Sequence, residues 1–134
     1  MTRKQQTTVR RLGPGDEEVV RRLAERTPQT ALLADERTIL LAAFVGSEPV
    51  GFVLGYELPR RHGKPSTLFV YELAVDAAHR RRGIATQLMS ELRDVGRARG
   101  VEESFVLTDP ENSAANELYA SLGGVRQESV MWEF

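Results

Sequence analysis

The sequence has no cysteine, only two histidines and almost no net charge. Without cysteine, the chain can form no disulfide, no thiolate nucleophile and no cysteine-ligated metal site. With His62 and His79 as its only imidazoles, we expect no metal centre. The formal net charge of −1 at pH 7 is far from the strongly basic balance of general nucleic-acid-binding proteins. We therefore expect no nucleic-acid partner.

Long apolar runs are also missing. No stretch approaches the ~20 residues of a membrane span, and no apolar core of a secretory signal follows the basic N-terminal residues. Hydrophobic residues make up 41% of the 134 residues, which is enough for one ordinary globular core. We therefore expect a cytoplasmic protein with no membrane partner, in which residues 1–134 form a single domain.

Hydrophobic periodicity and turn signals predict alternating strands and helices. The order β-α-α-β-β-β-α-β-α-β predicts an α/β fold, with a mostly antiparallel mixed sheet of about six strands and helices on both faces. The predicted strands are Val9–Leu12, Thr38–Val45, Val50–Leu58, Thr67–Val75, Ser104–Thr108 and Val125–Phe134. The predicted helices run from about Asp16 to Arg26, Pro28 to Ala34, Ile84 to Arg99, and from Asn112 or Ser113 to Leu122.

The stretch ELAVDAAHRRRGIA, residues 72–85, joins the fourth predicted strand to a helix. A helix N-terminus presents unpaired N–H groups and a partial positive charge, which suit a phosphate. Gly83 and Ala85 let an anion approach the backbone, and the arginines at 80–82 add forked donors. The residues alone also allow an exposed basic helix start with no ligand.

Glu72 is the second candidate, because a carboxylate in an apolar strand is costly to bury unless it faces a cleft or a partner. Burial would raise its pKa toward that of a useful general base. A salt-bridged structural acid is the alternative. Tyr119 is a third candidate, although its helical spacing alone favours a core aromatic.

Two segments resemble the GNAT superfamily of N-acetyltransferases. VYELAVDAAHRRRGIATQLM is similar to its acetyl-coenzyme-A-binding segment, whose signature Arg/Gln-x-x-Gly-x-Gly/Ala stands here at residues 80–85. NSAANELYASLGG is similar to a second family segment, with Asn112, Ala115, Leu118 and Tyr119 at the expected offsets. The resemblance covers nearly the whole chain, is weakest before Thr38, and implies the GNAT fold.

This resemblance implies direct transfer of acetyl from acetyl-coenzyme A to an amine. It implies that Glu72 is the general base and Tyr119 the general acid, and that the Val75 N–H polarises the thioester carbonyl. Backbone N–H groups from Arg81 to Thr86 would hold the pyrophosphate, and the end of the fourth strand would pair with the pantetheine arm. The implied cofactor contacts are Leu73, Ala74, Val75, Arg80, Arg81, Arg82, Gly83, Ile84, Ala85, Thr86, Asn112 and Tyr119.

Within the family, the chain is most similar to the type I aminoglycoside 3-N-acetyltransferases. They share an acid before LAV, then HRR-x-GIAT, and a Y-x-LP motif that stands here at Tyr56–Pro59. Two features depart from that pattern. Glu72 stands where the subfamily usually has aspartate, and the predicted two-helix region, about Asp16 to Arg37, is shorter than the one that helps to wall the acceptor site in relatives.

The resemblance therefore predicts a resistance-type enzyme that acetylates the 3-amino group of an aminoglycoside. The alternatives are another amine, such as a polyamine, an amino-sugar metabolite or a protein N-terminus, or a non-catalytic acyl-coenzyme-A-binding module. The acidic C-terminal third fits a cationic acceptor, and a solvated acidic face with no ligand is the alternative. The expected acceptor contacts are Tyr56, Glu57, Asp109, Glu111 and Glu133. Relatives are commonly dimers, so a homodimer is expected.

Overall fold

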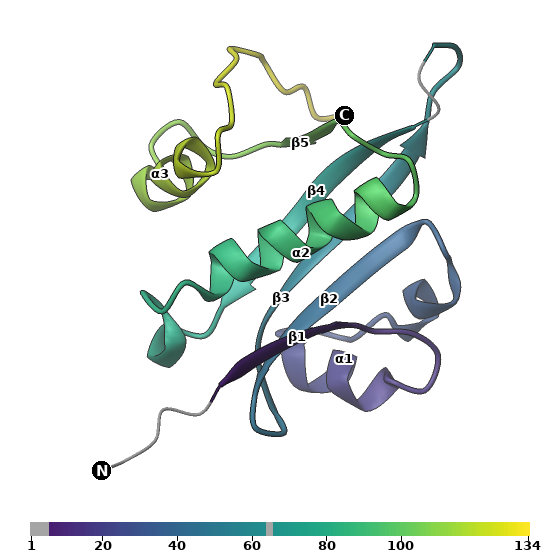
Figure 1. Ribbon diagram of the computed structural model, residues 1–134, viewed down its shortest axis with the longest axis vertical. Coiled ribbons are helices and arrows are strands. Elements are labelled where there is room, and N and C mark those ends of the chain that lie inside the picture. The colour runs from purple at the N-terminus through teal and green to yellow at the C-terminus, as the bar shows by residue number, and fades with distance from the viewer. Residues whose placement is uncertain (1–5, 64–65) are drawn as a thin grey trace.

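The computed structural model describes residues 6–63 and 66–134, and it folds them around one five-stranded sheet of order β1-β2-β3-β4-β5 (Figure 1). The first four strands pair antiparallel with their neighbours, and β5 pairs parallel with β4. The strands are β1 (Thr7–Arg11), β2 (Thr38–Val45), β3 (Glu48–Pro59), β4 (Ser66–Val75) and β5 (Ser104–Val106).

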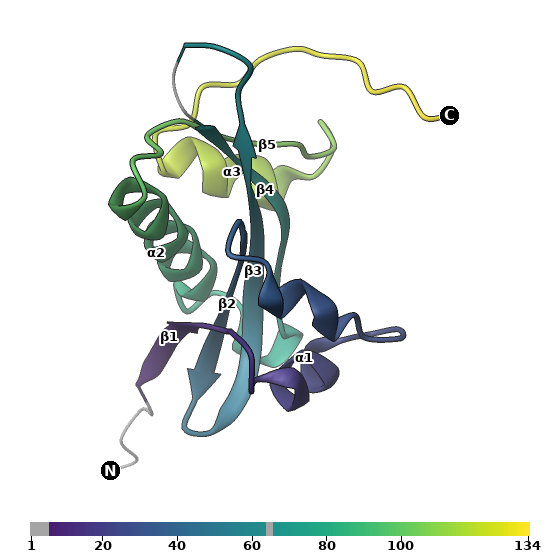
Figure 2. The same cartoon turned by 90° about the vertical axis from the view of Figure 1, so that its right-hand side faces the viewer.

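Helices cover both faces of this sheet, and Figure 2 shows α2 on one side and α1 on the other. The α-helices are α1 (Glu17–Leu23), α2 (Ile84–Ala98) and α3 (Ser113–Ser121), and two short 3-10 helices are η1 (Thr30–Ala34) and η2 (Ala77–His79). The predicted α/β mixed sheet with helices on both faces is thus confirmed. None of the helices in the described ranges is long and apolar enough to cross a lipid bilayer.

The core has two layers because β2 sends alternate side chains to opposite faces. Ile39 and Leu41 pack against the apolar stripe of α2, while Leu40 and Phe44 pack against α1 and η1. Burial of both faces explains why β2 is almost wholly apolar in sequence. The α1 side of the sheet is covered only in part, and that gap holds the site described below.

The predicted strand at Val125–Phe134 does not form, so the sheet has five strands rather than about six. Figure 2 shows this segment leaving α3 and running outward past the sheet. A strand needs a neighbouring edge for its N–H and C=O groups, and none of the described strands pairs with it. Its large apolar side chains are therefore exposed: Val125, Val130, Met131, Trp132 and Phe134.

The region between β1 and β2 also differs from the prediction. Helix α1 ends at Leu23 rather than Arg26, because Ala24 already has an extended backbone with ψ 133°. The second predicted helix is only a 3-10 turn that begins at Thr30 rather than Pro28. The residues between them, 24–29, therefore form a loop along one edge of the α1 face.

Glu57 was expected to contact an acceptor, and the structure corrects that expectation. Its carboxylate is 9% exposed and accepts two hydrogen bonds from the Arg99 guanidinium, with N···O distances of 2.6 and 3.2 Å. Arg99 follows the end of α2, so the pair lies on the α2 side of the sheet. The hydrogen bond to Glu57 raises the pKa of Arg99. Glu57 therefore ties β3 to the end of α2.

This pair predicts a specific loss of stability. Replacing Arg99 with alanine leaves a nearly buried carboxylate without its partner, so the free energy of unfolding should fall by about 1–3 kcal/mol. Arg97→Ala is the matched control, because its 2.6 Å bond to Asp94 joins two exposed side chains and should contribute about 0.5 kcal/mol or less. Urea unfolding of the two variants measures both values. Equal losses of unfolding free energy in the two variants would show that the burial of Glu57 does not increase the contribution of its pair with Arg99.

Candidate active site

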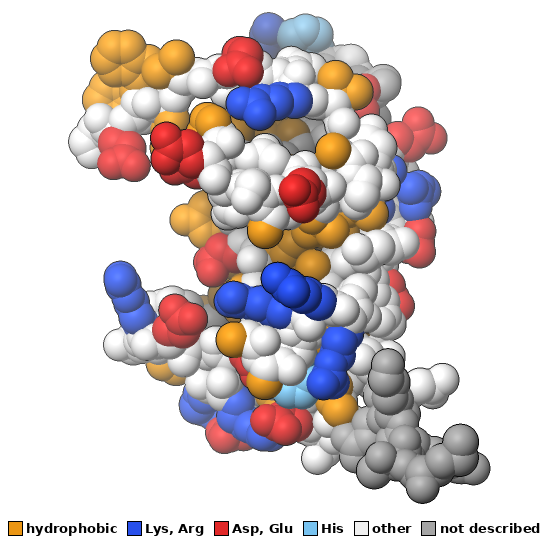
Figure 3. All heavy atoms as spheres, turned by 90° about the vertical axis from the view of Figure 1, so that its left-hand side faces the viewer, with side chains coloured by type: hydrophobic (Ala, Val, Ile, Leu, Met, Phe, Trp, Pro, Cys, Tyr) orange, Lys and Arg blue, Asp and Glu red, His pale blue; other side chains and the backbone are white. Residues whose placement is uncertain are grey.

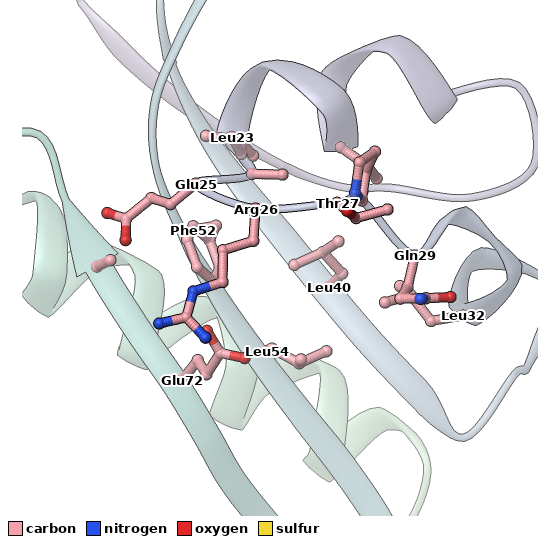
Figure 4. A pocket seen from close by; sticks show the side chains of 14 residues that line it. Leu23, Glu25, Arg26, Thr27, Gln29, Leu32, Leu40, Phe52, Leu54 and Glu72 are labelled. Atoms are coloured by element: carbon pink, nitrogen blue, oxygen red, sulfur yellow. The ribbon is translucent and has the colours of Figure 1, made fainter.

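A pocket of about 550 Å³ opens on the α1 face of the sheet (Figure 4). Its floor is apolar and includes Leu40, Phe52 and Leu54 from β2 and β3. The end of α1 and the 24–29 loop form one wall, and β4 forms the other. Three of the described residues that line it are charged, and they are Glu25, Arg26 and Glu72. The volume is in the range of small-molecule sites.

A bulge in β4 aims Glu72 into this pocket. Leu54 pairs with Glu72, but its neighbour Gly55 pairs with Val70, so Tyr71 is one extra residue in β4. The bulge places Tyr71 and Glu72 on the same face, where a regular strand would alternate them. Glu72 is exposed there, which corrects the expectation that both faces of this strand are covered. The structure places Glu72 in the lining of a pocket, whereas the sequence did not predict the exposure of its side chain.

Aromatic rings extend the pocket wall along the same face. Tyr71 contacts the rings of Tyr56 and Phe69, with centroid distances of 5.6 and 5.8 Å, and Phe69 contacts Phe105 at 4.6 Å. Burial, followed by the neighbouring Tyr71 and the charge of Glu72, raises the pKa of Tyr56. Tyr56, expected to contact the acceptor, therefore lies beside the pocket as a protonated phenol.

Beyond the bulge, the edge of β4 that faces β5 is open. The two strands share only the pairs from Leu68↔Ser104 to Val70↔Val106, whereas β4 continues to Val75. No strand in the described ranges pairs with this edge from residue 71 onward. The predicted cofactor contacts Leu73, Ala74 and Val75 thus lie on a strand with an open edge, which can offer backbone groups to an extended amide chain.

The loop after β4 turns sharply into α2. Arg81 and Gly83 both have left-handed backbone conformations, with φ of +63° and +76°. The helical ladder begins with the Gln87 N–H, which donates to the Gly83 carbonyl at 3.0 Å, so the N–H groups of Ile84, Ala85 and Thr86 precede it. Nothing lies within 4 Å of a Cβ built on Gly83, so an anion has open access to this backbone.

The three arginines of this loop have different surroundings. The Arg80 Nε donates to the Val75 carbonyl at 3.1 Å, so the side chain at the signature position holds the loop to the end of β4. Sequence reasoning had assigned Arg80 only to the ligand. Arg81 and Arg82 are exposed. Figure 3 shows this side of the molecule, where basic side chains gather below a hollow with an apolar floor.

The open β4 edge and the α2 N-terminus together fit a cofactor that has a pyrophosphate and an extended arm of amides. The edge offers backbone pairing, and the helix start offers free N–H groups beside cationic side chains. No cluster of three or more potential metal ligands occurs among residues 6–63 and 66–134.

On α3, the structure assigns Asn112 a local role. Its Oδ1 accepts the Ala115 N–H at 3.1 Å, so Asn112 is the N-cap of the helix. Tyr119 is half-buried and lines a second pocket of about 400 Å³ with Met89 and Phe105. Burial raises the pKa of Tyr119. Tyr119 does not line the Glu72 pocket, so the structure does not bring the two expected proton carriers into one cavity.

The remaining expected acceptor contacts lie away from the Glu72 pocket. The Asp109 Oδ1 accepts the Glu111 N–H at 2.9 Å, and both residues belong to the turn before α3. Glu133 lies in the exposed C-terminal segment. None of the three lines the pocket. The sequence did not identify Glu25 and Arg26 as pocket residues, because it predicted a helix to about Arg26, whereas α1 ends at Leu23.

A family model described as the acetyltransferase (GNAT) family matches residues 7–123. The chain belongs to this family. GNAT acetyltransferases use acetyl-coenzyme A, and the strand edge and helix start described above fit that cofactor.

Individual relatives differ in the acceptors that their names give. The chain is 34% identical to a solved aminoglycoside acetyltransferase from an uncultured soil metagenomic sample, with 96% of this chain and 97% of that one covered and a TM-score of 0.86. It is 40% identical over 74 residues to an L-2,4-diaminobutyric acid acetyltransferase of Streptomyces coelicolor. That match covers 54% of this chain and 42% of the relative, and the chain spans less than half of the curated relatives it matches.

A further solved structure, an aminoglycoside N-acetyltransferase in complex with coenzyme A, has a TM-score of 0.82. It is 20% identical, with 100% of this chain and 97% of that one covered. At this identity the likeness concerns the fold.

The N–H groups of residues 84–86 at the start of α2, which we call the pyrophosphate cradle, predict the effect of a charge at Gly83. Gly83→Glu should weaken acetyl-coenzyme-A binding by at least about 100-fold, because it repels the pyrophosphate and disturbs charge-assisted contacts of about 1.5–3 kcal/mol each. Gly100→Glu is the matched control, since Gly100 also has positive φ (+80°) and open space but lies at the other end of α2. Calorimetry should give unchanged affinity for the control. Unchanged affinity in Gly83→Glu would exclude the cradle.

Proposed function

We propose that the protein transfers acetyl from acetyl-coenzyme A to a primary amine of a small acceptor held in the Glu72 pocket. One observation carries this proposal. A single strand, β4, presents a carboxylate to an acceptor-sized pocket and leads, through an open edge, to a helix start suited to pyrophosphate. A donor on the edge and an amine in the pocket would meet at the end of β4, and such positioning contributes much of the rate in transfer reactions.

The residue roles follow from this arrangement. Bound acetyl-coenzyme A supplies an activated acetyl thioester. The Glu72 carboxylate accepts the proton that an ammonium must lose before its nitrogen can attack. The Val75 N–H is the proposed donor to the carbonyl oxygen of the thioester. The Tyr119 hydroxyl, which burial keeps protonated, is the proposed proton source for the thiolate leaving group.

For the acceptor, the first candidate is an aminoglycoside. The sequence resemblance to the 3-N-acetyltransferases supports it, and so does the 34% identical aminoglycoside acetyltransferase, which matches over almost its whole length. Attack by the 3-amino group and a contribution to antibiotic resistance belong to this candidate and rest on the resemblance alone.

The second candidate is a small diamino acid. The curated relatives are L-2,4-diaminobutyric acid acetyltransferases, and the pocket carries an arginine beside its two acids. Release of free thiol in an acetylation screen distinguishes the candidates when it includes gentamicin-type aminoglycosides, L-2,4-diaminobutyrate, polyamines and peptides. Release with peptides alone would contradict both, and no release with bound acetyl-coenzyme A would support a non-catalytic module.

The base assignment predicts a large loss of turnover in Glu72→Gln. Loss of a general base should lower kcat by roughly 10²-fold or more, while acetyl-coenzyme-A affinity stays unchanged. Glu25→Gln is the control, because Glu25 is the only other carboxylate that lines the pocket. Steady-state kinetics over a range of pH measures both variants. If Glu25→Gln shows the larger loss in kcat, Glu25 and not Glu72 is the base.

The proposal extends to a homodimer, which the exposed C-terminal segment supports. Trp132 is 78% exposed and Phe134 is fully exposed. Large apolar side chains that gather on a surface usually mark an interface with another protein. The segment has the sequence of a strand, and β5 has a free edge in the described sheet. A second copy of the chain could thus supply the neighbour that the segment lacks.

Trp132 is the only tryptophan, so its fluorescence reports directly on this segment. We expect a dimer by light scattering, with blue-shifted emission that moves to the red as dilution separates the subunits. Trp132→Arg should give a monomer, whereas Leu58→Arg, at an exposed apolar residue outside the segment, should remain dimeric. A monomer with solvent-exposed tryptophan emission at all concentrations would contradict the homodimer.

A further inference from the structure

Arg26 is a charged residue of the pocket that the proposed chemistry does not use. It lies in the 24–29 loop, and Figure 4 shows its side chain reaching across the pocket toward Glu72. The two groups do not form an ion pair within 4.0 Å, and Arg26 has no hydrogen bond or ion pair with any of the described residues. Its guanidinium donors are therefore free for a ligand.

The position of this guanidinium matters for the charge of the acceptor. Glu25 and Glu72 attract ammonium groups, but Arg26 repels them from the same cavity. An acceptor with several ammonium groups must place at least one of them near the Arg26 guanidinium, which repels it. An acceptor with one anionic group and one or two amines can satisfy all three side chains. The pocket is thus complementary to a molecule with both signs of charge.

The floor of the pocket is apolar, although the polar side chains of Thr27 and Gln29 also line the wall. The floor between Arg26 and Glu72 consists of apolar side chains such as Phe52 and Leu54. These side chains offer no partners for the many hydroxyl groups of a sugar, whereas a short chain of methylenes can lie on them without loss of hydrogen bonds. The floor therefore favours an aliphatic spacer between the two charged ends of the acceptor.

We propose that Arg26 is a specificity-determining residue that binds the carboxylate of an amino-acid-like acceptor, whose reacting amine lies at Glu72. This inference rests on the proposed acetyl transfer and names the class of acceptor. A guanidinium presents paired N–H donors that match the two oxygens of a carboxylate. A phosphate fits less well, because its greater negative charge would meet the same single arginine and two glutamates.

The test compares two acceptors that differ at this one group, L-2,4-diaminobutyrate and its carboxamide, at a pH where the reacting amine of both is an ammonium. With the wild-type chain, kcat/KM should be at least about tenfold higher for the carboxylate, since hydrogen bonds to charged groups contribute about 1.5–3 kcal/mol. Arg26→Gln should remove this preference, lowering kcat/KM for the carboxylate by about 10- to 100-fold and changing the carboxamide by about twofold or less.

Arg22→Gln is the matched control, because Arg22 is an exposed arginine on α1 that does not line the pocket. This variant should keep the wild-type preference for the carboxylate. That result would show that loss of a positive charge outside the pocket does not remove the preference. Acetyl-coenzyme-A affinity should be the same in all three proteins.

The outcomes separate this inference from the proposed function. Equal kcat/KM for the two acceptors, or a preference that survives Arg26→Gln, would overturn the role of Arg26 and leave acetyl transfer intact. Turnover of gentamicin-type aminoglycosides far above that of the diamino acid, unaffected by Arg26→Gln, would also overturn it. If no amine in the set is acetylated, both the function and the inference fail.

Discussion

A strand in a sheet alternates its side chains between two faces, and β4 breaks this alternation once, at Tyr71. The extra residue places Tyr71 and Glu72 together on the α1 face, while Leu73 and Val75 still pack with the α2 layer. Without the bulge, one of the two neighbouring residues would have to face the apolar layer beneath α2. Either the carboxylate or a large aromatic ring would then lie among Val53, Leu88 and Leu92. The position of the acid in the pocket therefore depends on the register of β3 and β4.

That register depends in turn on close approach of the two backbones. A Cβ at Gly51 would lie 2.9 Å from the Ala74 carbonyl oxygen, so only glycine allows the end of β4 to come this near. A Cβ at Gly55 would press on the side chains of Leu68 and Leu92 at 3.2 Å. On its other side, β4 pairs with β5 at only three positions, so the edge of β4 beyond Val70 is open while β3 holds the strand in place.

The elements that sequence predicted well are those specified by local signals. The apolar stripe of α2, the glycine before it and the Asn112 cap are read within one or two turns of helix, and their boundaries agree with the structure to within a residue or so. The elements predicted poorly depend on distant partners. Val125–Phe134 has a strand-like sequence but pairs with none of the described strands, and Glu57 has its partner 42 residues away in Arg99. The place of Arg26 in the pocket follows from the end of α1 at Leu23. Hydrophobic periodicity does not show where a residue with an extended backbone ends a helix.

The charge of the acceptor is another property for which the overall composition is a poorer guide than the side chains that line the pocket. The acids of the C-terminal third suggest attraction for a polycation, yet Asp109, Glu111 and Glu133 do not line the Glu72 pocket. Exposed charges farther apart than a Debye length, about 8 Å at physiological ionic strength, are largely screened from one another. Such acids can steer a cation toward the protein, but they contribute little to its affinity once it is bound. Within the pocket, one arginine and two glutamates lie around an apolar floor, and in the proposed function these side chains select the acceptor.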